Sequence, residues 1–282
     1  VVPMLEVLLM QNWARVQSVI EVINKPLEMR DTSQLGDFRR LKPQFIEGTS
    51  KKHRQNIFLS LFPHPYFKSL FRSVTDESVL GEPQEIDGSP KIPTAVESIP
   101  LRVRQYFLRV PATSMKDAHQ ERLKYFTEKL YHTRLQYYLA TRTPLLVIVP
   151  TYYQYVGVRA FFEENLTESY SDVCEYTSQD DFRRALRNFN TQQVHILLTT
   201  ERYYFYKRHL LKGISVLIWY APPVFPQFYV EYMHAVSRDA EASCVITLFS
   251  KYDAHALLRI VGPERAGLFL DPKADTDVFC VH

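Results

Sequence analysis

The second half of this 282-residue chain is predicted to be an α/β domain built on a doubly wound parallel sheet. Short apolar runs alternate there with longer stretches whose apolar residues recur at helical spacing, which is typical of βαβ units. A run as dense as LLVIVP at 145–150 suits a strand that is buried on both faces. Because doubly wound folds bind their ligands at the carboxyl ends of the strands, we expect the functional surface at that edge.

Six apolar runs define the expected strands of this sheet. They lie at residues 104–110, 145–150, 171–177, 194–200, 214–220 and 243–249. Stretches with helical spacing separate them, most clearly at 119–139, 155–165 and 178–189. Strand and helix therefore alternate along this half of the chain.

The first half opens on the apolar run PMLEVLLM at 3–10, which we interpret as a strand. Apolar residues then recur at helical spacing from residue 11, and this predicted helix stops at Pro26. A second short strand, NIFLSLF, is predicted at 56–62. The abrupt opening, without a cap or a preceding turn, indicates that further residues lie upstream.

The two halves are predicted to be separate domains joined by a linker. Residues 76–100 are rich in Pro, Gly, Ser and acidic residues and show little hydrophobic periodicity. We therefore expect one domain at 1–75, the linker at 76–100 and the second domain at 101–282.

The composition favours a globular protein and argues against a membrane-spanning or secreted one. With 46% hydrophobic and 13% aromatic residues, the chain can build substantial cores. It has no apolar run of the roughly 18 to 20 residues that a membrane span needs, and its N-terminal run lacks the flanks of a signal peptide. The net charge is +3, so a nucleic-acid surface must be a local patch. Three cysteines without a CxxC pair favour a reducing compartment and argue against a zinc site.

Motifs give no support for an enzyme, a cofactor or a small-molecule substrate. No GxxxxGK[ST] phosphate loop, HExxH metal motif or GxSxG nucleophile elbow is present in this sequence. The neighbouring carboxylates Glu163 and Glu164 are interpreted as part of a solvated helix face. We therefore predict no cofactor and no metal.

Four segments together resemble the U3 small nucleolar RNA-associated protein 25 family, also called the digestive organ expansion factor family. They are VLLMQNW, RQNIFLSLFP, CEYTSQDDFRRA and LTTERYYFYKRHLLKGISVLIWYAPP. The resemblance covers the chain nearly end to end. It implies two RecA-like lobes without the ATPase residues, the first incomplete here and the second complete, and a nucleolar role in the small-subunit processome.

Active DEAD-box helicases, which this family resembles at greater distance, allow a comparison of motif positions in the first lobe. The acidic tetrad aligns with Pro3, Met4, Leu5 and Glu6. Its metal-binding and water-orienting carboxylates thus fall on Pro3 and Met4. The Ser-Ala-Thr element aligns with Ser60, Leu61 and Phe62, so one hydroxyl is kept. Because Mg²⁺ needs oxygen ligands, we expect the metal to be poorly held.

Two further motifs fall in the second lobe. Motif five, which begins Thr-Asp in active enzymes, aligns with Thr200 and Glu201. The two arginine fingers of motif six align with Ala235 and Arg238, so one arginine is kept. An arginine finger can contribute about 10³ to 10⁵ in rate to phosphoryl transfer. The resemblance therefore implies negligible hydrolysis.

The segment TTERYYFYKRHLLK at 199–212 has two interpretations. In one, Tyr203, Tyr206 and Leu210 pack inward and the cations of a surface helix are merely solvated. In the other, the cations contact phosphates or an acidic partner while an aromatic ring stacks on a base or peptide. The candidate cations are Arg202, Lys207, Arg208 and Lys212. Secondary candidates in DDFRRALRNF are Arg183, Arg184 and Arg187.

These observations favour a catalytically inactive helicase-like scaffold in the nucleolus, acting in pre-rRNA processing and assembly of the 40S ribosomal subunit. Its expected partners are pre-rRNA or U3 small nucleolar RNA and other processome proteins, with no membrane and no small-molecule substrate. One alternative is an active RNA-dependent ATPase whose phosphate loop lies upstream. Another is an α/β module that binds proteins only.

Overall fold

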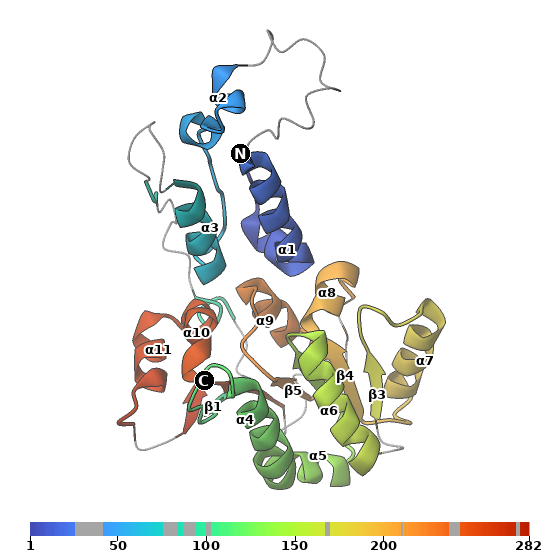
Figure 1. Cartoon of the computed structure of the whole chain (residues 1–282). Coiled ribbons are helices and arrows are strands. Elements are labelled where there is room, and N and C mark those ends of the chain that lie inside the picture. Colours follow the sequence, from blue (N-terminus) through green and yellow to red (C-terminus); the bar gives the residue numbers. More distant parts are fainter. Residues whose placement is uncertain are drawn as a thin grey trace. The chain divides into compact units, whose positions relative to one another are not determined.

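The structure, a computed structural model, separates into two compact units, Val1–Ile92 and Pro93–His282 (Figure 1). It describes residues 1–25, 42–75, 84–86, 94–99, 103–166, 170–209, 211, 213–236, 243–274 and 277–281. No helix within these ranges is long and apolar enough to cross a membrane. Each unit is described by itself below.

The second unit contains a seven-stranded sheet in the order β3-β4-β2-β5-β6-β1-β7. Its strands are β1 (Arg104–Arg109), β2 (Leu145–Val149), β3 (Tyr170–Val173), β4 (Ile196–Thr200), β5 (Val216–Trp219), β6 (Cys244–Phe249) and β7 (Val278–Val281). All neighbouring strands pair in parallel except β1 and β7, which are antiparallel. The predicted α/β class with a parallel-dominated sheet is confirmed.

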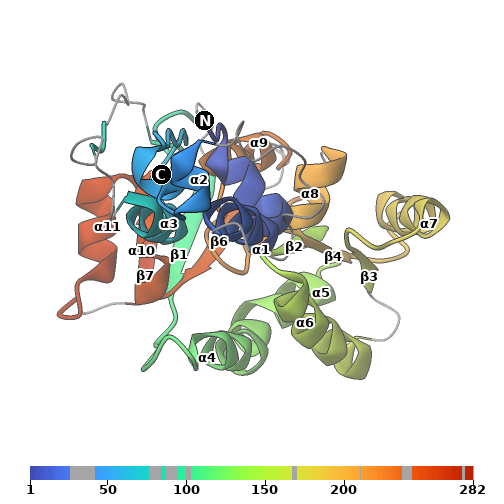
Figure 2. The same ribbon diagram turned by 45° about the horizontal axis from the view of Figure 1, so that its top comes forward.

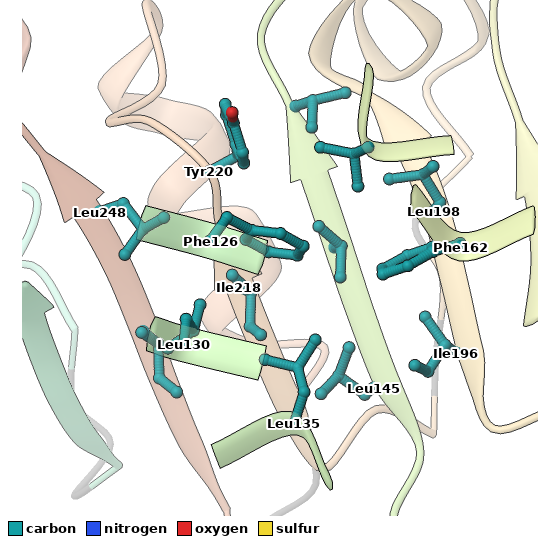
Figure 3. Packing of buried hydrophobic residues seen from close by; sticks show 14 of the residues in the cluster. Phe126, Leu130, Leu135, Leu145, Phe162, Ile196, Leu198, Ile218, Tyr220 and Leu248 are labelled. Carbon is teal, nitrogen blue, oxygen red and sulfur yellow. The ribbon is translucent and has the colours of Figure 1, made fainter. Parts of the chain in front are cut away.

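The central strands are apolar because helices cover both of their faces. Every residue of β2, β4, β5 and β6 is buried. Figure 3 shows one face, where Phe126, Leu130, Leu135 and Phe162 pack against Leu145 and other apolar residues of the strands. On the opposite face Trp219 contacts two tyrosines of the following helix. Burial on both faces explains why dense apolar runs predicted these strands.

The helices of this unit alternate with the strands, as the sequence predicts. They are α4 (Ala118–Lys124), the π-helix η4 (Tyr125–Leu135), α5 (Gln136–Ala140), α6 (Tyr152–Asn165), α7 (Gln179–Asn190), α8 (Glu201–Lys207), α9 (Pro226–Met233), the 3₁₀-helix η5 (Lys251–Asp253), α10 (Ala254–Val261) and α11 (Pro263–Leu270). The six predicted strands are confirmed with shorter bounds. The strand β7 was not predicted. Its apolar run VFCV is only four residues long and lies at the edge of the sheet, where only Val281 is buried.

In the first unit the predicted strand at 3–10 is wrong. The helix α1 (Leu5–Asn24) begins inside that run and has non-helical backbone at Asn12, with φ −159° and ψ 86°. Its second part confirms the predicted helix. A short apolar run cannot be assigned to a strand or a buried helix by periodicity, and here Leu5 and Met10 are buried on the helix.

The predicted strand at 56–62 is reduced to a single parallel bridge between Phe58 and Val2. The remaining elements of this unit are the helices α2 (Pro43–Ile46), η3 (Ser50–His53) and α3 (Pro65–Thr75). Most of the predicted linker at 76–100 lies outside the described residues. Within it, residues 94–99 turn against α10, where the amide of Val96 donates to the carbonyl of Ile260 at 3.0 Å.

Candidate functional site

The segment that begins at Thr199 lies at the carboxyl edge of the sheet, as predicted. β4 ends at Thr200, whose hydroxyl oxygen accepts from the amide of Tyr203 at 3.0 Å and so caps α8. The same hydroxyl donates to Oε2 of Glu175 at 2.7 Å. Glu175 follows β3, so this contact joins the ends of two neighbouring strands.

The aromatic residues of α8 that face the interior are not all the ones that were predicted. Tyr203 is buried as expected, but Tyr206 is 45% exposed, and Tyr204 is the second inward-facing residue at 4% exposure. Tyr204 packs on Phe228 and Tyr232 of α9, with ring centroids 4.9 and 4.7 Å away. The expected inward packing of Tyr206 is therefore wrong, because α9 lies beside Tyr204. Leu210 lies outside the described residues.

The cations of α8 differ in how far they are neutralised. Nε of Arg202 lies 3.5 Å from Oε1 of Glu175, and its guanidinium also donates to the hydroxyl of Tyr206 at 3.2 Å. Arg208 pairs with Glu231 at 2.8 Å, whereas Lys207 is exposed. Lys212 lies outside the described residues. The three described cations share one short helix and the residue that ends it.

The secondary candidates on α7 are exposed and paired within their own helix. Nη1 of Arg183 lies 3.4 Å from Asp180, and Nη2 of Arg184 lies 2.5 Å from Asp181. Both pairs join side chains three residues apart in the first turn, where acidic residues stabilise the helix N-terminus. Exposed pairs of this kind contribute little free energy, so both guanidinium groups are free to exchange partners.

Glu201, at the predicted motif-five position, turns its carboxyl into the protein. Oε1 accepts from the amides of Val224 at 2.9 Å and Phe225 at 3.4 Å, which fixes the loop between β5 and α9. Burial raises the pKa of Glu201 to about 8 because desolvation outweighs these hydrogen bonds and the charge of Arg259. Burial likewise lowers the pKa of Arg259 to about 10. Glu201 therefore stabilises the loop between β5 and α9 at the carboxyl edge of the sheet.

In the first unit the two segments aligned with helicase motifs contact each other. The amide of Leu61 donates to Oε2 of Glu6 at 3.3 Å, and the amide of Leu5 donates to the carbonyl of Leu59 at 3.0 Å. Glu6 is 3% exposed, so the carboxylate of the tetrad position is turned inward onto backbone.

The remaining aligned positions of the first unit carry no other carboxylate. Pro3, Met4 and Leu61 are exposed, whereas Leu5 and Phe62 are buried. The hydroxyl of Ser60 donates to the carbonyl of Phe62 at 2.8 Å. In the second unit Ala235 is buried, and Arg238 lies outside the described residues. Among the residues described, no group of three or more His, Cys, Asp or Glu side chains could hold a metal ion.

Sequence reasoning missed the residues that surround the α8 cations. Glu175 follows another strand, and Glu231 lies on α9, more than twenty residues from Arg208 along the chain. Glu175 lies in the segment CEYTSQDDFRRA, but nothing in that segment indicates that its carboxylate faces Arg202, and only the fold brings both carboxylates to α8. A local pattern in the sequence could not have identified them.

Family comparison identifies the relationship of this chain to known proteins. A family model described as "Utp25, C-terminal domain" matches residues 95–279, more than half of the chain. The chain belongs to the Utp25 family. A second model, "UTP25, NTP hydrolase-like domain", matches residues 1–78.

Members of the Utp25 family match nearly the whole chain. The Xenopus tropicalis protein named "U3 small nucleolar RNA-associated protein 25 homolog" is 32% identical over 278 residues, covering 96% of this chain and 35% of its own length. The Homo sapiens protein of the same name is 29% identical, with coverage of 97% and 35%. "Protein NUCLEOLAR FACTOR 1" of Arabidopsis thaliana is 28% identical, with coverage of 98% and 35%. The chain thus spans about a third of these relatives.

Two solved structures of DEAD-box proteins are distantly similar to this chain. The E. coli DEAD-box protein SrmB is 12% identical with a TM-score of 0.43, covering 56% of this chain and 83% of that chain. Dbp5 of S. cerevisiae, solved with RNA and ADP BeF3, is 13% identical with a TM-score of 0.41, covering 74% and 49%. These values are too low to support an argument about function.

Proposed function

We propose that this protein is a catalytically inactive, helicase-like scaffold that acts in pre-rRNA processing and 40S subunit assembly in the nucleolus. Membership of the Utp25 family supports a role alongside U3 small nucleolar RNA, which the names of its relatives contain. Pre-rRNA or U3 RNA and other small-subunit processome proteins are the proposed partners. Because the chain spans about a third of those relatives, this proposal concerns the longer protein.

One observation carries the proposal of inactivity. The carboxylate of Glu6, at the last position of the aligned tetrad, is buried and accepts a hydrogen bond from the amide of Leu61. The two positions where a metal-binding and a water-orienting carboxylate are expected hold Pro3 and Met4. A site of this kind has little with which to hold Mg²⁺ against its hydration shell.

The proposed scaffold surface is the carboxyl edge around α8. Lys207 is exposed there, Arg202 lies beside the exposed ring of Tyr206, and Arg208 lies over the buried ring of Tyr204. Cations beside aromatic rings can bind single-stranded RNA through phosphate contacts and base stacking. The α7 cations Arg183 and Arg184 are proposed as secondary contacts.

Calorimetry and phosphate release test the proposed inactivity. Full-length protein titrated with ATP and Mg²⁺ is expected to give no measurable heat of binding, and added RNA is expected to elicit no phosphate release. An active DEAD-box ATPase under the same conditions is the control. Binding in the micromolar range, or RNA-stimulated turnover, would contradict inactivity and favour the alternative of an RNA-dependent ATPase.

A further inference from the structure

A pocket between α8 and α9 is assigned no role by the motifs. Its volume is about 310 Å³, and it is formed entirely within the second unit. Figures 1 and 2 show these two helices beside each other. The lining residues are Phe205, Arg208, Phe225, Gln227, Phe228 and Glu231.

The apolar part of the pocket consists of three phenylalanine rings. Phe225 and Phe228 are 6% and 4% exposed and stack with centroids 4.9 Å apart. Phe205, which is only partly buried, lies 5.7 Å from Phe225 and forms the wall. Phe205 therefore offers more ring surface to a ligand than the other two, and aromatic rings are enriched at protein interfaces.

The polar rim is formed by one ion pair held in a fixed position. The guanidinium of Arg208 lies 4.9 Å from the ring centroid of Tyr204 and 5.1 Å from that of Phe228. Nη2 donates to Oε1 of Glu231 at 2.8 Å, while the hydroxyl of Tyr204 donates to Oε2. Both oxygens of Glu231 are thus occupied. Arg208 has five N–H donors in all, so it keeps donors for a ligand.

The backbone also fixes Arg208. Its φ is 53°, in the left-handed region, and its amide donates to the carbonyl of Tyr204 at 2.9 Å to close the end of α8. This geometry directs the side chain back over the aromatic cluster. A guanidinium that is already positioned loses less rotamer entropy when it binds an acceptor.

Size and charge select the class of ligand. A volume of about 310 Å³ lies at the lower limit for small-molecule sites, so it suits one apolar side chain better than a whole metabolite. The carboxylate of Glu231 on the rim disfavours a polyanion such as RNA. The remaining donors of Arg208 favour a single carboxylate beside the apolar group.

We propose that this pocket binds a short peptide segment of a partner protein, in which an apolar side chain packs against the phenylalanine wall and a neighbouring acidic residue binds Arg208. This inference rests on the proposed scaffold function in one respect: a scaffold has partner proteins that could supply such a peptide. It does not depend on whether ATP is hydrolysed.

Peptide selection on the 282-residue chain tests the proposal. The probe is a phage-displayed library of random short peptides, and selected peptides are synthesised and titrated by fluorescence anisotropy. Enriched sequences are expected to pair a large apolar residue with Asp or Glu. The test variants are Phe205→Ala, at a partly exposed wall position, and Arg208→Asn, because Asn tolerates a left-handed backbone.

Each test variant is expected to weaken peptide binding about tenfold or more. Lys116→Ala is the control, because Lys116 is an exposed lysine of the same unit that does not line the pocket and belongs to no proposed contact surface, and it is expected to bind peptides unchanged. No enrichment, or peptides that bind both test variants as well as the parent chain, would overturn the proposal. Weaker binding of single-stranded RNA by the test variants, with peptide binding unchanged, would make the pocket an RNA site. The ATP experiment tests the proposed inactivity, and the peptide experiment tests the pocket. A negative result in one therefore does not affect the other proposal.

Discussion

Glu201 shows how a polar residue at a functional edge can serve the fold. Its sequence position suggests a remnant of a helicase motif, yet its carboxyl binds the amides of Val224 and Phe225 inside the protein. The side chain is 1% exposed, so the charged form is penalised by desolvation. The sequence predicts that Glu201 follows a strand at the carboxyl edge. It does not predict that the side chain points inward, because that depends on the loop before α9.

Stability is expected to depend on pH through Glu201. Its pKa is about 8 in the folded protein and near 4.5 when unfolded, so between these values the folded state binds a proton that the unfolded state has lost. This contribution to the free energy of unfolding is fully present below about pH 4.5 and is lost as pH rises to about 8, by up to about 1 kcal/mol per pH unit.

Urea unfolding of the parent chain and of Glu201→Gln, measured from pH 5 to 9, tests this expectation. The glutamine keeps an acceptor for both amides but does not titrate, so its stability is expected to fall less across this range. Asp271→Asn, at an exposed carboxylate, is the control and is expected to follow the parent chain. Parallel curves for the parent and Glu201→Gln would mean that Glu201 is already ionised at pH 5.

At the scale of elements, apolar density predicted strands well where burial is two-sided. β2 and β4 were predicted because every residue in them is buried. The run at 3–10 is also largely apolar but begins a helix, and β7 is a strand although only Val281 in it is buried. Periodicity thus identified the buried sheet and failed where tertiary contacts decide between helix and strand.

The sequence analysis correctly predicted α8 at the carboxyl edge of the sheet, but it did not predict which residues surround that helix. The strand that precedes it could be identified from the sequence, which fixed the position of Lys207 and Arg208. The partners Glu175 and Glu231 come from other elements and are brought in by the strand order. The consequence is that Lys207, which pairs with no carboxylate among the described residues, is the best cation of this element for an RNA phosphate.

Replacing Lys207 with Ala is expected to weaken RNA binding equally for all sequences. The slope of log K against log salt should fall by about 0.7 for single-stranded RNA if one phosphate contact is lost. Arg183→Ala, at an exposed cation paired with Asp180, is the control and is expected to have a smaller effect. Filter binding across a series of salt concentrations measures both. Unchanged affinity and slope, together with loss of a processome protein in a pull-down, would make this surface a protein interface.

At the scale of the whole chain, the sequence divides into two compact units, Val1–Ile92 and Pro93–His282. The composition of residues 76–100 offers little apolar surface to offset the entropy of ordering the chain, and the predicted linker rests on that argument. The described turn at 94–99 contacts α10, so the predicted linker includes at least one segment that packs on the second unit. The domain bounds remain predictions.

Limited proteolysis is expected to cut first within residues 76–93. Mass spectrometry of the earliest fragments locates the cut, and the strands between 145 and 220 are expected to survive because their backbone is paired and buried. The turn at 94–99 serves as an internal control and should be cut later than 76–93. Early cleavage within the sheet, with this segment intact, would show that the predicted boundary is misplaced.

Because of the π-helix η4, the packing of the second unit depends on the number of residues in this helix as well as on their type. Phe126, Leu130 and Leu135 are at most 1% exposed and are spaced by four and then five residues, which fits the wide i→i+5 turn. In a regular α-helix position 134, four residues after Leu130, would continue the buried row. In η4 Leu135 takes that place, while Arg134 is only partly buried and lies 4.7 Å from the ring centroid of Tyr106 on β1. Inserting one residue between Leu130 and Leu135 would space them by six, which places them on one face of neither an α-helix nor a π-helix, so Leu135 would turn out of the core.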